Sequence, residues 1–313
     1  MSTRPLYGFF LSLLTAVMWG VLPLFLTLTL RDLDAVSITC FRFLFAAIVV
    51  FLVLKIRNEF PVMRQFQPKV TAFLVMAGLG LTINYVANVK GLELIDPESA
   101  QVIIQTAPFM LMLGGILIFK ESFTRLQKTG ATVLLIGFAL FFEENLQVLF
   151  SGASQYTAGV LTILFAALAW AFYALIQKWL FSFFTARQLT LVMYGIGAVV
   201  LMPFTQWSGL WQLSWLTGLA LLFCCVNTLV GYGAFTAAMG VWQASKVSAV
   251  ISLAPVFTIL SMMVAVWWFP DYFVAAEIGS VAYFGAGLVV LGSMLTSLGK
   301  RDTVTTETRF DIK

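Results

Sequence analysis

The feature that most constrains the fold of this chain is a series of apolar runs, each long enough to cross a membrane. A helix needs about 20 residues to span the roughly 30 Å hydrocarbon core of a bilayer. The runs are continuous rather than alternating with period two, so they predict helices and not the strands of a barrel. Ten runs follow one another at 6–30, 36–55, 70–90, 97–119, 125–142, 156–180, 187–205, 214–238, 243–268 and 275–298. The sequence therefore predicts an all-α integral membrane protein with ten transmembrane helices.

Composition supports this interpretation and excludes several classes of protein. Hydrophobic residues make up 61% of the chain and charged residues 10%, whereas soluble domains are about 45–50% apolar and about 25% charged. Lipid must then cover much of the surface, which excludes a soluble enzyme, a nucleic-acid binder and a disulfide scaffold. The chain has no histidine, so histidine zinc sites and imidazole proton relays are excluded as well. It also has no GxxxxGK[ST] loop for a nucleotide. We expect no enzymatic activity, no cofactor and no metal site.

The distribution of basic residues predicts the orientation in the membrane. Cytoplasmic loops carry an excess of Lys and Arg. With the N-terminus inside, all of the 18 Lys and Arg residues fall on the cytoplasmic side except Arg31, Arg42, Lys90 and Lys246. Because ten spans return the chain to the side where it began, both termini are predicted to be cytoplasmic. The polar segment 299–313 is expected to be a disordered cytoplasmic tail, and we expect the bacterial inner (plasma) membrane because no organellar targeting segment is apparent.

The two halves of the chain resemble each other. An offset of 147 residues, with small local shifts, aligns several positions: Tyr85 with Tyr232, Ala107 with Ala254, Pro108 with Pro255, and further upstream Trp19 with Trp170. Each half, 1–145 and 155–298, then contains five spans. Five is an odd number, so the second half enters the membrane from the opposite side, and the prediction is two inverted five-helix repeats. Such repeats are typical of secondary transporters, whose halves rock about a site near the midplane. The alternative is a receptor or assembly factor that contains a duplication.

Polar residues share one face of the fourth span and one face of the ninth. Polar groups inside spans are costly and usually face a cavity or a partner. Helical spacing places Glu98, Gln101, Gln105 and Pro108 on one face, and the repeat offset leads from them to Ser245, Ser248, Ser252 and Pro255. Lining of a cavity is favoured for the glutamines, while close helix packing is an equal alternative for the serines. Each proline permits a bend, which serves either packing or a gate.

Other spans contribute aromatic and amide side chains to the predicted pocket. Amides both donate and accept hydrogen bonds, and aromatic walls hold apolar or cationic groups. For the tryptophans, core packing or anchoring at the membrane interface is the alternative. The candidate substrate-binding residues are Trp19, Asn84, Asn88, Gln101, Gln105, Trp170, Tyr173, Asn227, Tyr232, Ser248 and Ser252.

Charged residues in or near the spans are candidates for coupling and gating, together with the two prolines. For Arg42 we favour a structural role, as the partner of an acid such as Asp34 or Glu98 or as a cap on helix carbonyls, and contact with the substrate is the alternative. Lys90 and Lys246 are expected to reach the membrane interface, with a gate or an anion-binding group as the alternative.

Glu98 has two interpretations of nearly equal weight. The string Asp96-Pro97-Glu98 is typical of the start of a helix, with an N-cap, a proline at the first position and an acid in the first turn. The alternative is a titrating carboxylate at the outer mouth of the cavity, which would couple transport to protons. Without histidine, a carboxylate is the natural carrier of such a proton, and Glu98 is the one on the polar face of the fourth span.

Short motifs at characteristic places carry a family resemblance. They are Trp19-Gly20, Arg42-Phe43, Gly91-Leu92, Pro108, Glu121 and Gln127 with Gly130, and the second half repeats Trp170, Pro255 and Gly279 but lacks the arginine. In these motifs the chain resembles the EamA-type ten-helix transporters of the drug/metabolite transporter superfamily. The resemblance implies secondary transport of amino acids or related metabolites, in many members as export. Protons, a small-molecule solute and membrane lipid are the expected partners. Uptake of a zwitterionic or cationic metabolite and lipid handling without transport are the alternatives.

Overall fold

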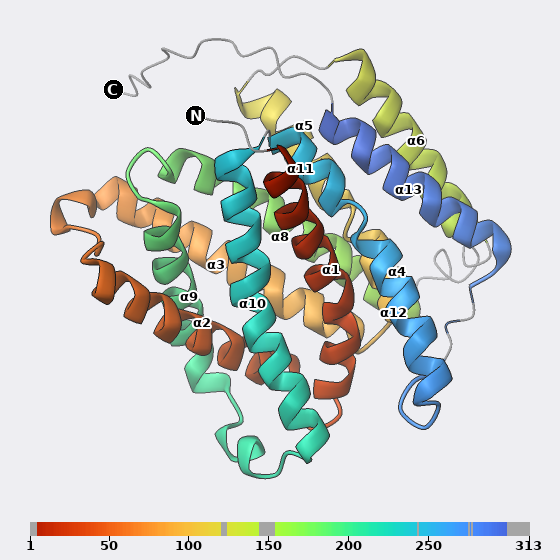
Figure 1. Ribbon diagram of the computed structural model, residues 1–313, viewed down its shortest axis with the longest axis horizontal. Helices are drawn as coiled ribbons and strands as arrows, with labels where there is room; N and C mark the ends of the chain where they lie inside the picture. Colours follow the sequence, from red (N-terminus) through yellow and green to blue (C-terminus); the bar gives the residue numbers. More distant parts are fainter. Residues whose placement is uncertain are drawn as a thin grey trace.

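The computed structural model describes residues 5–119, 124–143, 154–242, 244–274, 276 and 278–298. In these residues the chain is helical and contains no strands (Figure 1). Within these residues, seven helical segments are long and apolar enough to cross a membrane, so the prediction of an all-α membrane protein is confirmed. The predicted tail at 299–313 and the predicted end of the first half at 145 lie outside the described residues.

The helices follow the predicted runs closely. The first half contains α1 (Pro5–Thr29), α2 (Ala35–Arg57), α3 (Pro68–Leu92), α4 (Pro97–Ile103), α5 (Thr106–Phe119) and α6 (Arg125–Phe141). The second half contains α8 (Gln155–Leu180), α9 (Ala186–Leu201), α10 (Trp215–Val241), α11 (Ala244–Ile251), α12 (Ala254–Trp268) and α13 (Ser280–Leu298). Short 3-10 turns lie in the loops at η1 (Met63–Gln65), η3 (Met202–Phe204) and η4 (Trp207–Trp211).

Two of the predicted spans are interrupted. The fourth span consists of α4 and α5, and the ninth consists of α11 and α12. Pro108 and Pro255 each lie in the first turn of the second helix. Backbone N–H groups in the first turn of a helix have no intrahelical acceptor, so a proline there costs no hydrogen bond. The fixed φ angle of proline also suits the start of a helix. The prolines therefore start a new helix instead of bending a continuous one.

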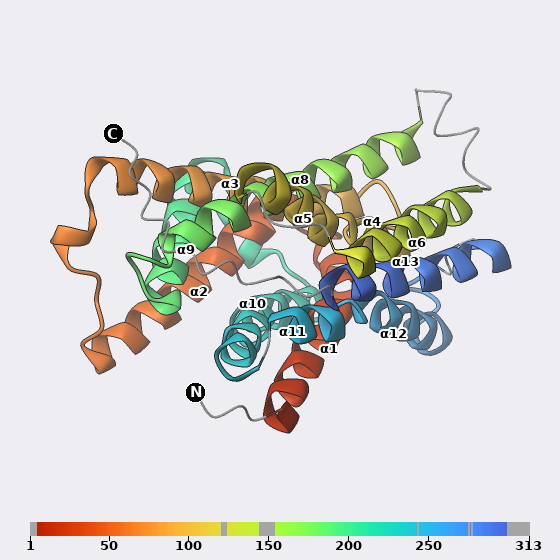
Figure 2. The same cartoon turned by 90° about the horizontal axis from the view of Figure 1, so that it is seen from above.

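Each large helix interface joins one helix from the first half to one from the second. The most extensive contacts are between α6 and α13, α1 and α10, α3 and α8, and α2 and α9. Figure 2 shows α2 and α9 toward one end of the molecule and α6 with α13 toward the other. The two halves are thus interleaved rather than placed side by side as separate bodies.

Glycines bring α6 and α13 unusually close. A Cβ atom on Gly137 would lie 2.6 Å from the backbone nitrogen of Val289 and 2.8 Å from the carbonyl oxygen of Gly285. At Gly130, it would lie 2.5 Å from the backbone nitrogen of Thr296. Backbone atoms cannot move aside as flexible side chains do, so only glycine fits at these crossing points, as in other close helix pairs of membrane proteins.

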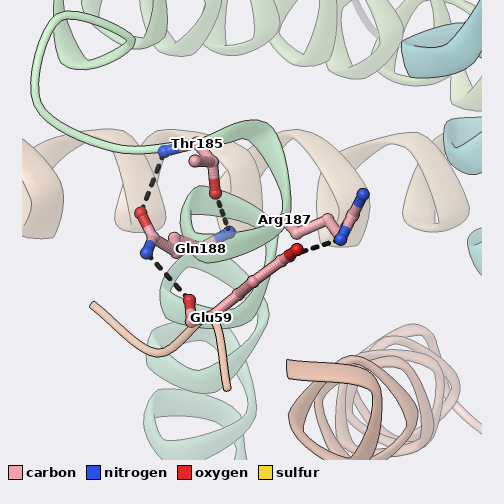
Figure 3. Close-up of polar contacts among 4 residues, drawn as sticks. All are labelled: Glu59, Thr185, Arg187 and Gln188. Carbon is pink, nitrogen blue, oxygen red and sulfur yellow. Dashed lines mark hydrogen bonds and ion pairs between the residues drawn. The ribbon is translucent and has the colours of Figure 1, made fainter. Parts of the chain in front are cut away.

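Polar contacts fasten the loop after α2 to the start of α9 (Figure 3). Thr185 and Gln188 form a capping box, in which the backbone nitrogen of Gln188 donates to Thr185 Oγ1 at 3.3 Å and that of Thr185 donates to Gln188 Oε1 at 3.0 Å. The Gln188 side chain also donates to the carbonyl oxygen of Glu59 at 2.9 Å. Arg187 forms an ion pair with the Glu59 carboxylate. One helix start therefore serves as the attachment point for a loop of the other half.

The loop between α1 and α2 is also attached to the second half, at the start of α10. Asp32, which follows α1, accepts a hydrogen bond from the backbone nitrogen of Ser214 at 3.2 Å. Hydrogen bonds from the Thr217 hydroxyl and from Ser214 lower the pKa of Asp32 below its ordinary value, since they favour the charged carboxylate. Ser214 is in turn the N-cap of α10.

Candidate functional site

A buried arginine lies where α2, α3 and α10 meet. Arg42 is only 3% exposed. Its Nε donates a hydrogen bond to Thr228 Oγ1 at 3.1 Å. The guanidinium carbon lies 4.7 Å from the centroid of the Tyr85 ring, so the charge rests on the negative face of an aromatic system. Arg42 is thus held between a hydroxyl on α10 and a phenol on α3.

Three tyrosines surround this arginine. The Tyr85 and Tyr194 rings each lie 6.4 Å from the Tyr232 ring, and Phe43 packs against both Tyr85 and Tyr194 at 4.7 and 5.0 Å. The charge of Arg42 acts on the hydroxyls of all three tyrosines. The result is a cluster of one cation and three phenols built by α2 and α3 from the first half and by α9 and α10 from the second.

Two of these tyrosines were missed as site residues by the sequence reasoning. Tyr85 was recognised only as the repeat partner of Tyr232, and that partnership could have placed it in the site. Tyr194 has no such signal, because nothing in its spacing sets it apart from a core aromatic residue of α9.

The predicted aromatic residues of the first, sixth and eighth spans do come together. The Trp19 ring lies 5.1 Å from the Tyr232 ring. Gly231 makes this possible, because a Cβ atom there would lie 2.6 Å from the indole nitrogen of Trp19. On α8, Trp170 interacts with the Tyr232 hydroxyl, and Tyr173 is buried and accepts a hydrogen bond from Gln177 at 2.5 Å.

The expected pairing of Arg42 with an acid is wrong. Asp34 is the N-cap of α2 and accepts hydrogen bonds from the backbone nitrogens of Val36 and Ser37 at 2.9 and 3.0 Å. The start of the helix thus occupies its carboxylate. Among the described residues Glu98 forms no ion pair with Arg42, and its Oε2 is buried there without a hydrogen-bond partner.

Two of the predicted pocket amides instead tie helices together. Asn84 Nδ2 donates to the carbonyl oxygen of Ala166 at 2.8 Å, joining α3 to α8. Asn227 Nδ2 donates to the carbonyl oxygen of Met18 at 2.5 Å, joining α10 to α1. Asn227 Oδ1 is buried without a partner in the described part of the chain. Asn88 is partly buried one turn after Asn84.

A second polar cluster lies at the two helix interruptions. Gln105 Nε2 donates to the carbonyl oxygen of Ser252 at 3.5 Å, and Ser293 on α13 donates to Gln105 Oε1 at 3.3 Å. The hydroxyls of Ser252 and Ser293 are 3.0 Å apart, and Ser252 also donates to the Ser248 carbonyl at 3.0 Å. Gln101 is partly buried one turn before Gln105. Sequence reasoning missed Ser293, because a serine inside a span resembles a small packing residue.

Glu98 lies apart from the arginine cluster. It sits in the first turn of α4 and is 5% exposed. The N-cap role belongs to its neighbour Asp96, which accepts a hydrogen bond from the backbone nitrogen of Ser99 at 2.7 Å. Tyr283, near the start of α13, is close enough to interact electrostatically with Glu98. Glu98 is therefore a buried carboxyl group at the start of the interrupted fourth span.

The two lysines lie at the surface. Lys90 forms an ion pair with Glu93 near the end of α3, and Lys246 is exposed in the first turn of α11. Neither forms part of the arginine cluster. The side chain of Ser245 lies outside the described residues.

The chain matches known proteins over almost its whole length. The profile of the EamA-like transporter family matches residues 6–142 and 157–298. An "Uncharacterized transporter" of Haemophilus influenzae is 36% identical over 96% of this chain and 98% of its own. The "Uncharacterized inner membrane transporter YhbE" of Escherichia coli K12 is 35% identical over 94% of this chain and 92% of its own. A "Probable amino-acid metabolite efflux pump" of Salmonella typhimurium is 25% identical over 82% of this chain and 85% of its own.

Proposed function

Because the chain belongs to the EamA-like transporter family, we propose that it is a secondary active transporter that exports amino acids or related metabolites across the bacterial inner membrane. The observation that carries this proposal is the cluster around Arg42, which is built by helices of both halves. Alternating access needs a site at such a boundary, where rocking of one half against the other opens it to each side in turn.

We further propose that ten crossings form two inverted repeats of five. In this organisation α4 with α5 and α11 with α12 each make one crossing. Paired contacts support it. Asn84 donates to the Ala166 carbonyl, and Thr15 donates to the Gly231 carbonyl at 3.3 Å. The repeat aligns Asn84 with Gly231 and Ala166 with Thr15. The contact between α3 and α8 and the contact between α10 and α1 therefore join equivalent positions of the two halves.

The direction of transport and the solute class rest on the relatives. A distant relative is named as an amino-acid metabolite efflux pump, and a nearer one as an inner membrane transporter.

We propose that Glu98 carries the coupling proton. The support is its buried Oε2, which has no hydrogen-bond partner among the described residues. Leaving a charged oxygen buried and unpaired is costly, and a proton on that oxygen relieves the cost. Glu98 lies in the first turn of α4, the first part of an interrupted span, where a change in packing would alter its access to water.

Solute counterflow in proteoliposomes tests the proposed function. The full-length protein is reconstituted and loaded with a panel of unlabelled amino acids and related metabolites, and entry of the labelled solute is followed. We expect exchange of at least one amino acid or amino-acid derivative. Absence of exchange with every polar metabolite would overturn the transport proposal. Accumulation in right-side-out vesicles under an inward proton gradient would instead indicate uptake.

A further inference from the structure

We propose that Arg42 is the anchor for a carboxylate of the transported solute, so that the protein carries anionic or zwitterionic molecules and rejects purely cationic ones. This inference rests on the proposed function and adds the chemical class of the solute. It is argued from the charge, burial and hydrogen bonding of the described residues around Arg42.

Arg42 carries a buried charge without an acidic partner among the described residues. An ionised group buried in protein is normally paired with an opposite charge, and charged residues inside membrane spans mark pathways for substrates or ions. The ion pairs of the described chain are Lys90 with Glu93 and Arg187 with Glu59, both at the surface. No described carboxylate pairs with Arg42, although Arg42 is almost fully buried. The described part of the protein therefore supplies no anion that balances the charge of Arg42.

Contacts with two neighbouring helices orient the guanidinium group of Arg42. Nε is already engaged by Thr228, and one flat face lies against the Tyr85 ring. Among the residues that the structure describes, the bond to Thr228 is the only hydrogen bond of this side chain. The N–H groups of Nη1 and Nη2 at the end of the side chain therefore have no described acceptor and are available to a solute. Those two nitrogens present parallel N–H groups that match the two oxygens of a carboxylate.

Thr228 holds the guanidinium group of Arg42 in place from α10. Its hydroxyl donates to the Cys224 carbonyl at 2.9 Å and so presents a lone pair to Arg42 Nε. Thr228 is therefore a positioning residue: it sets the direction of the guanidinium without contacting the solute.

The second half of the chain has no arginine at the position that corresponds to Arg42. If the repeat fold itself required this arginine, an equivalent would be expected in α9. The offset of 147 residues leads from Arg42 to Leu189, and the offset of 151 residues that separates Trp19 from Trp170 leads to Met193; both are buried apolar residues. The protein thus keeps one buried cation beside the three tyrosines, where the neutral phenols can add hydrogen bonds to an anion.

Binding of three matched probes tests this inference. L-Phenylalanine is a zwitterion, N-acetyl-L-phenylalanine is an anion, and L-phenylalanine amide is a cation, while all three share one ring. Affinity is measured from the thermal stability of the full-length protein in detergent at increasing probe concentration. We expect the two carboxylate probes to bind and the amide to bind at least about tenfold more weakly, because an ionic hydrogen-bonded pair is lost.

Variants of the cluster sharpen the test. Arg42→Gln should weaken binding of both carboxylate probes by about 10- to 100-fold. Arg42→Lys keeps the charge but loses the paired donors and should lie between wild type and Arg42→Gln. Thr228→Val should weaken carboxylate binding by several-fold and leave the selectivity against the amide in place. The exposed Arg187→Gln removes one positive charge elsewhere and should leave all affinities unchanged. Monodisperse elution in size-exclusion chromatography confirms that each variant is folded.

Three results would overturn the inference: equal binding of the amide and the acids, unchanged carboxylate affinity in Arg42→Gln, or no binding of either carboxylate probe by the wild type. Counterflow separates these results from failure of the proposed function. If amino acids exchange and Arg42→Gln exchanges them at the wild-type rate, only the inference fails. If nothing exchanges but the carboxylate probes bind through Arg42, the transport proposal fails and the anion site stands.

Discussion

Gln105 donates its side-chain amide to the backbone carbonyl of Ser252, a residue 147 positions later in the chain. That separation equals the repeat offset, so the two residues are counterparts that touch each other. Both lie at the point where a predicted span is interrupted, one between α4 and α5 and the other between α11 and α12. An interrupted helix leaves carbonyl groups without their usual N–H donors, and here one half supplies a donor for the other.

Removing this contact should destabilise the protein. We expect Gln105→Leu to lower the free energy of unfolding by about 1 kcal/mol, since the Ser252 carbonyl and the Ser293 hydroxyl lose a buried partner. Thermal unfolding in detergent measures the effect. Thr162→Ala on the exposed face of α8 removes a hydroxyl that bonds only within its own helix, and it should cost much less. Equal stability of both variants would show that the contact between the interruptions carries no weight.

The glycines between α6 and α13 allow a sharper comparison. Gly285→Ala would place a Cβ atom 2.5 Å from the backbone nitrogen of Phe141, whereas Gly287, two residues later, has nothing within 4 Å of the same position. We expect Gly285→Ala to destabilise the protein by about 2 kcal/mol through overpacking. Gly287→Ala should be neutral or slightly stabilising, because alanine favours a helix. Similar melting temperatures for the two variants would contradict the close approach of these helices.

Glu98→Gln tests the proposed proton coupling. Glutamine fills a similar volume but cannot take up or release a proton, so solute exchange should continue while transport driven by a pH gradient is lost. Reconstituted vesicles with and without a pH gradient measure both activities. Asp96 is the N-cap of α4, and Asp96→Asn keeps a capping side chain, so it serves as the matched control with coupling intact. Full pH-driven transport by Glu98→Gln would remove this residue from the mechanism.

At the loop after α2, the exposed ion pair should matter less than the amide beside it. Arg187→Gln removes a surface pair with Glu59 and should cost less than about 1 kcal/mol. Gln188→Leu removes both its share of the capping box and its hydrogen bond to the Glu59 carbonyl, and should cost about 1–2 kcal/mol. Thermal unfolding of the two single variants measures which one is less stable. A larger loss of stability in Arg187→Gln would show that the ion pair matters more than the amide.

Asp32 should make stability depend on pH in one direction. Its pKa is lowered in the folded protein by hydrogen bonds from Thr217 and Ser214. A lowered pKa means that the stabilisation is present above the unfolded pKa of about 3.9 and is lost as the pH falls through the lower folded value. Thermal unfolding of the wild type and Asp32→Asn between pH 6 and 3 measures the difference. We expect the wild type to be more stable than Asp32→Asn at pH 6 and to lose this difference toward pH 3. A difference in stability that grows on acidification would contradict a lowered pKa of Asp32.

Apolar runs and the repeat predicted the helices, and the repeated prolines predicted where two spans depart from regularity. Local sequence patterns are enough to predict these helices, because a membrane helix makes its backbone hydrogen bonds within its own segment. The roles of polar side chains were harder to predict. Asn84 and Asn227 look like pocket amides in sequence, yet each bonds to a carbonyl on a neighbouring helix. Which helix lies opposite a residue is a tertiary fact that spacing along one helix does not contain.

Arg42 shows the same difficulty for a charged residue. Its position inside the second span predicted a partner, but the nearby acid Asp34 is occupied by the first turn of α2. The hydroxyl that does bind Arg42 comes from Thr228, 186 residues away. Only the packing of α2 against α10 reveals that the arginine sits among tyrosines rather than among acids.

The interleaving of the halves has a consequence for biogenesis. A helix that leaves the translocation machinery early must tolerate lipid before its partners are synthesised. Arg42 lies near the start of α2 and therefore enters the bilayer while Thr228, Tyr194 and Tyr232 have not yet been made, although a charged residue within a span is costly without its partners. Insertion of α2 therefore precedes assembly of the arginine cluster.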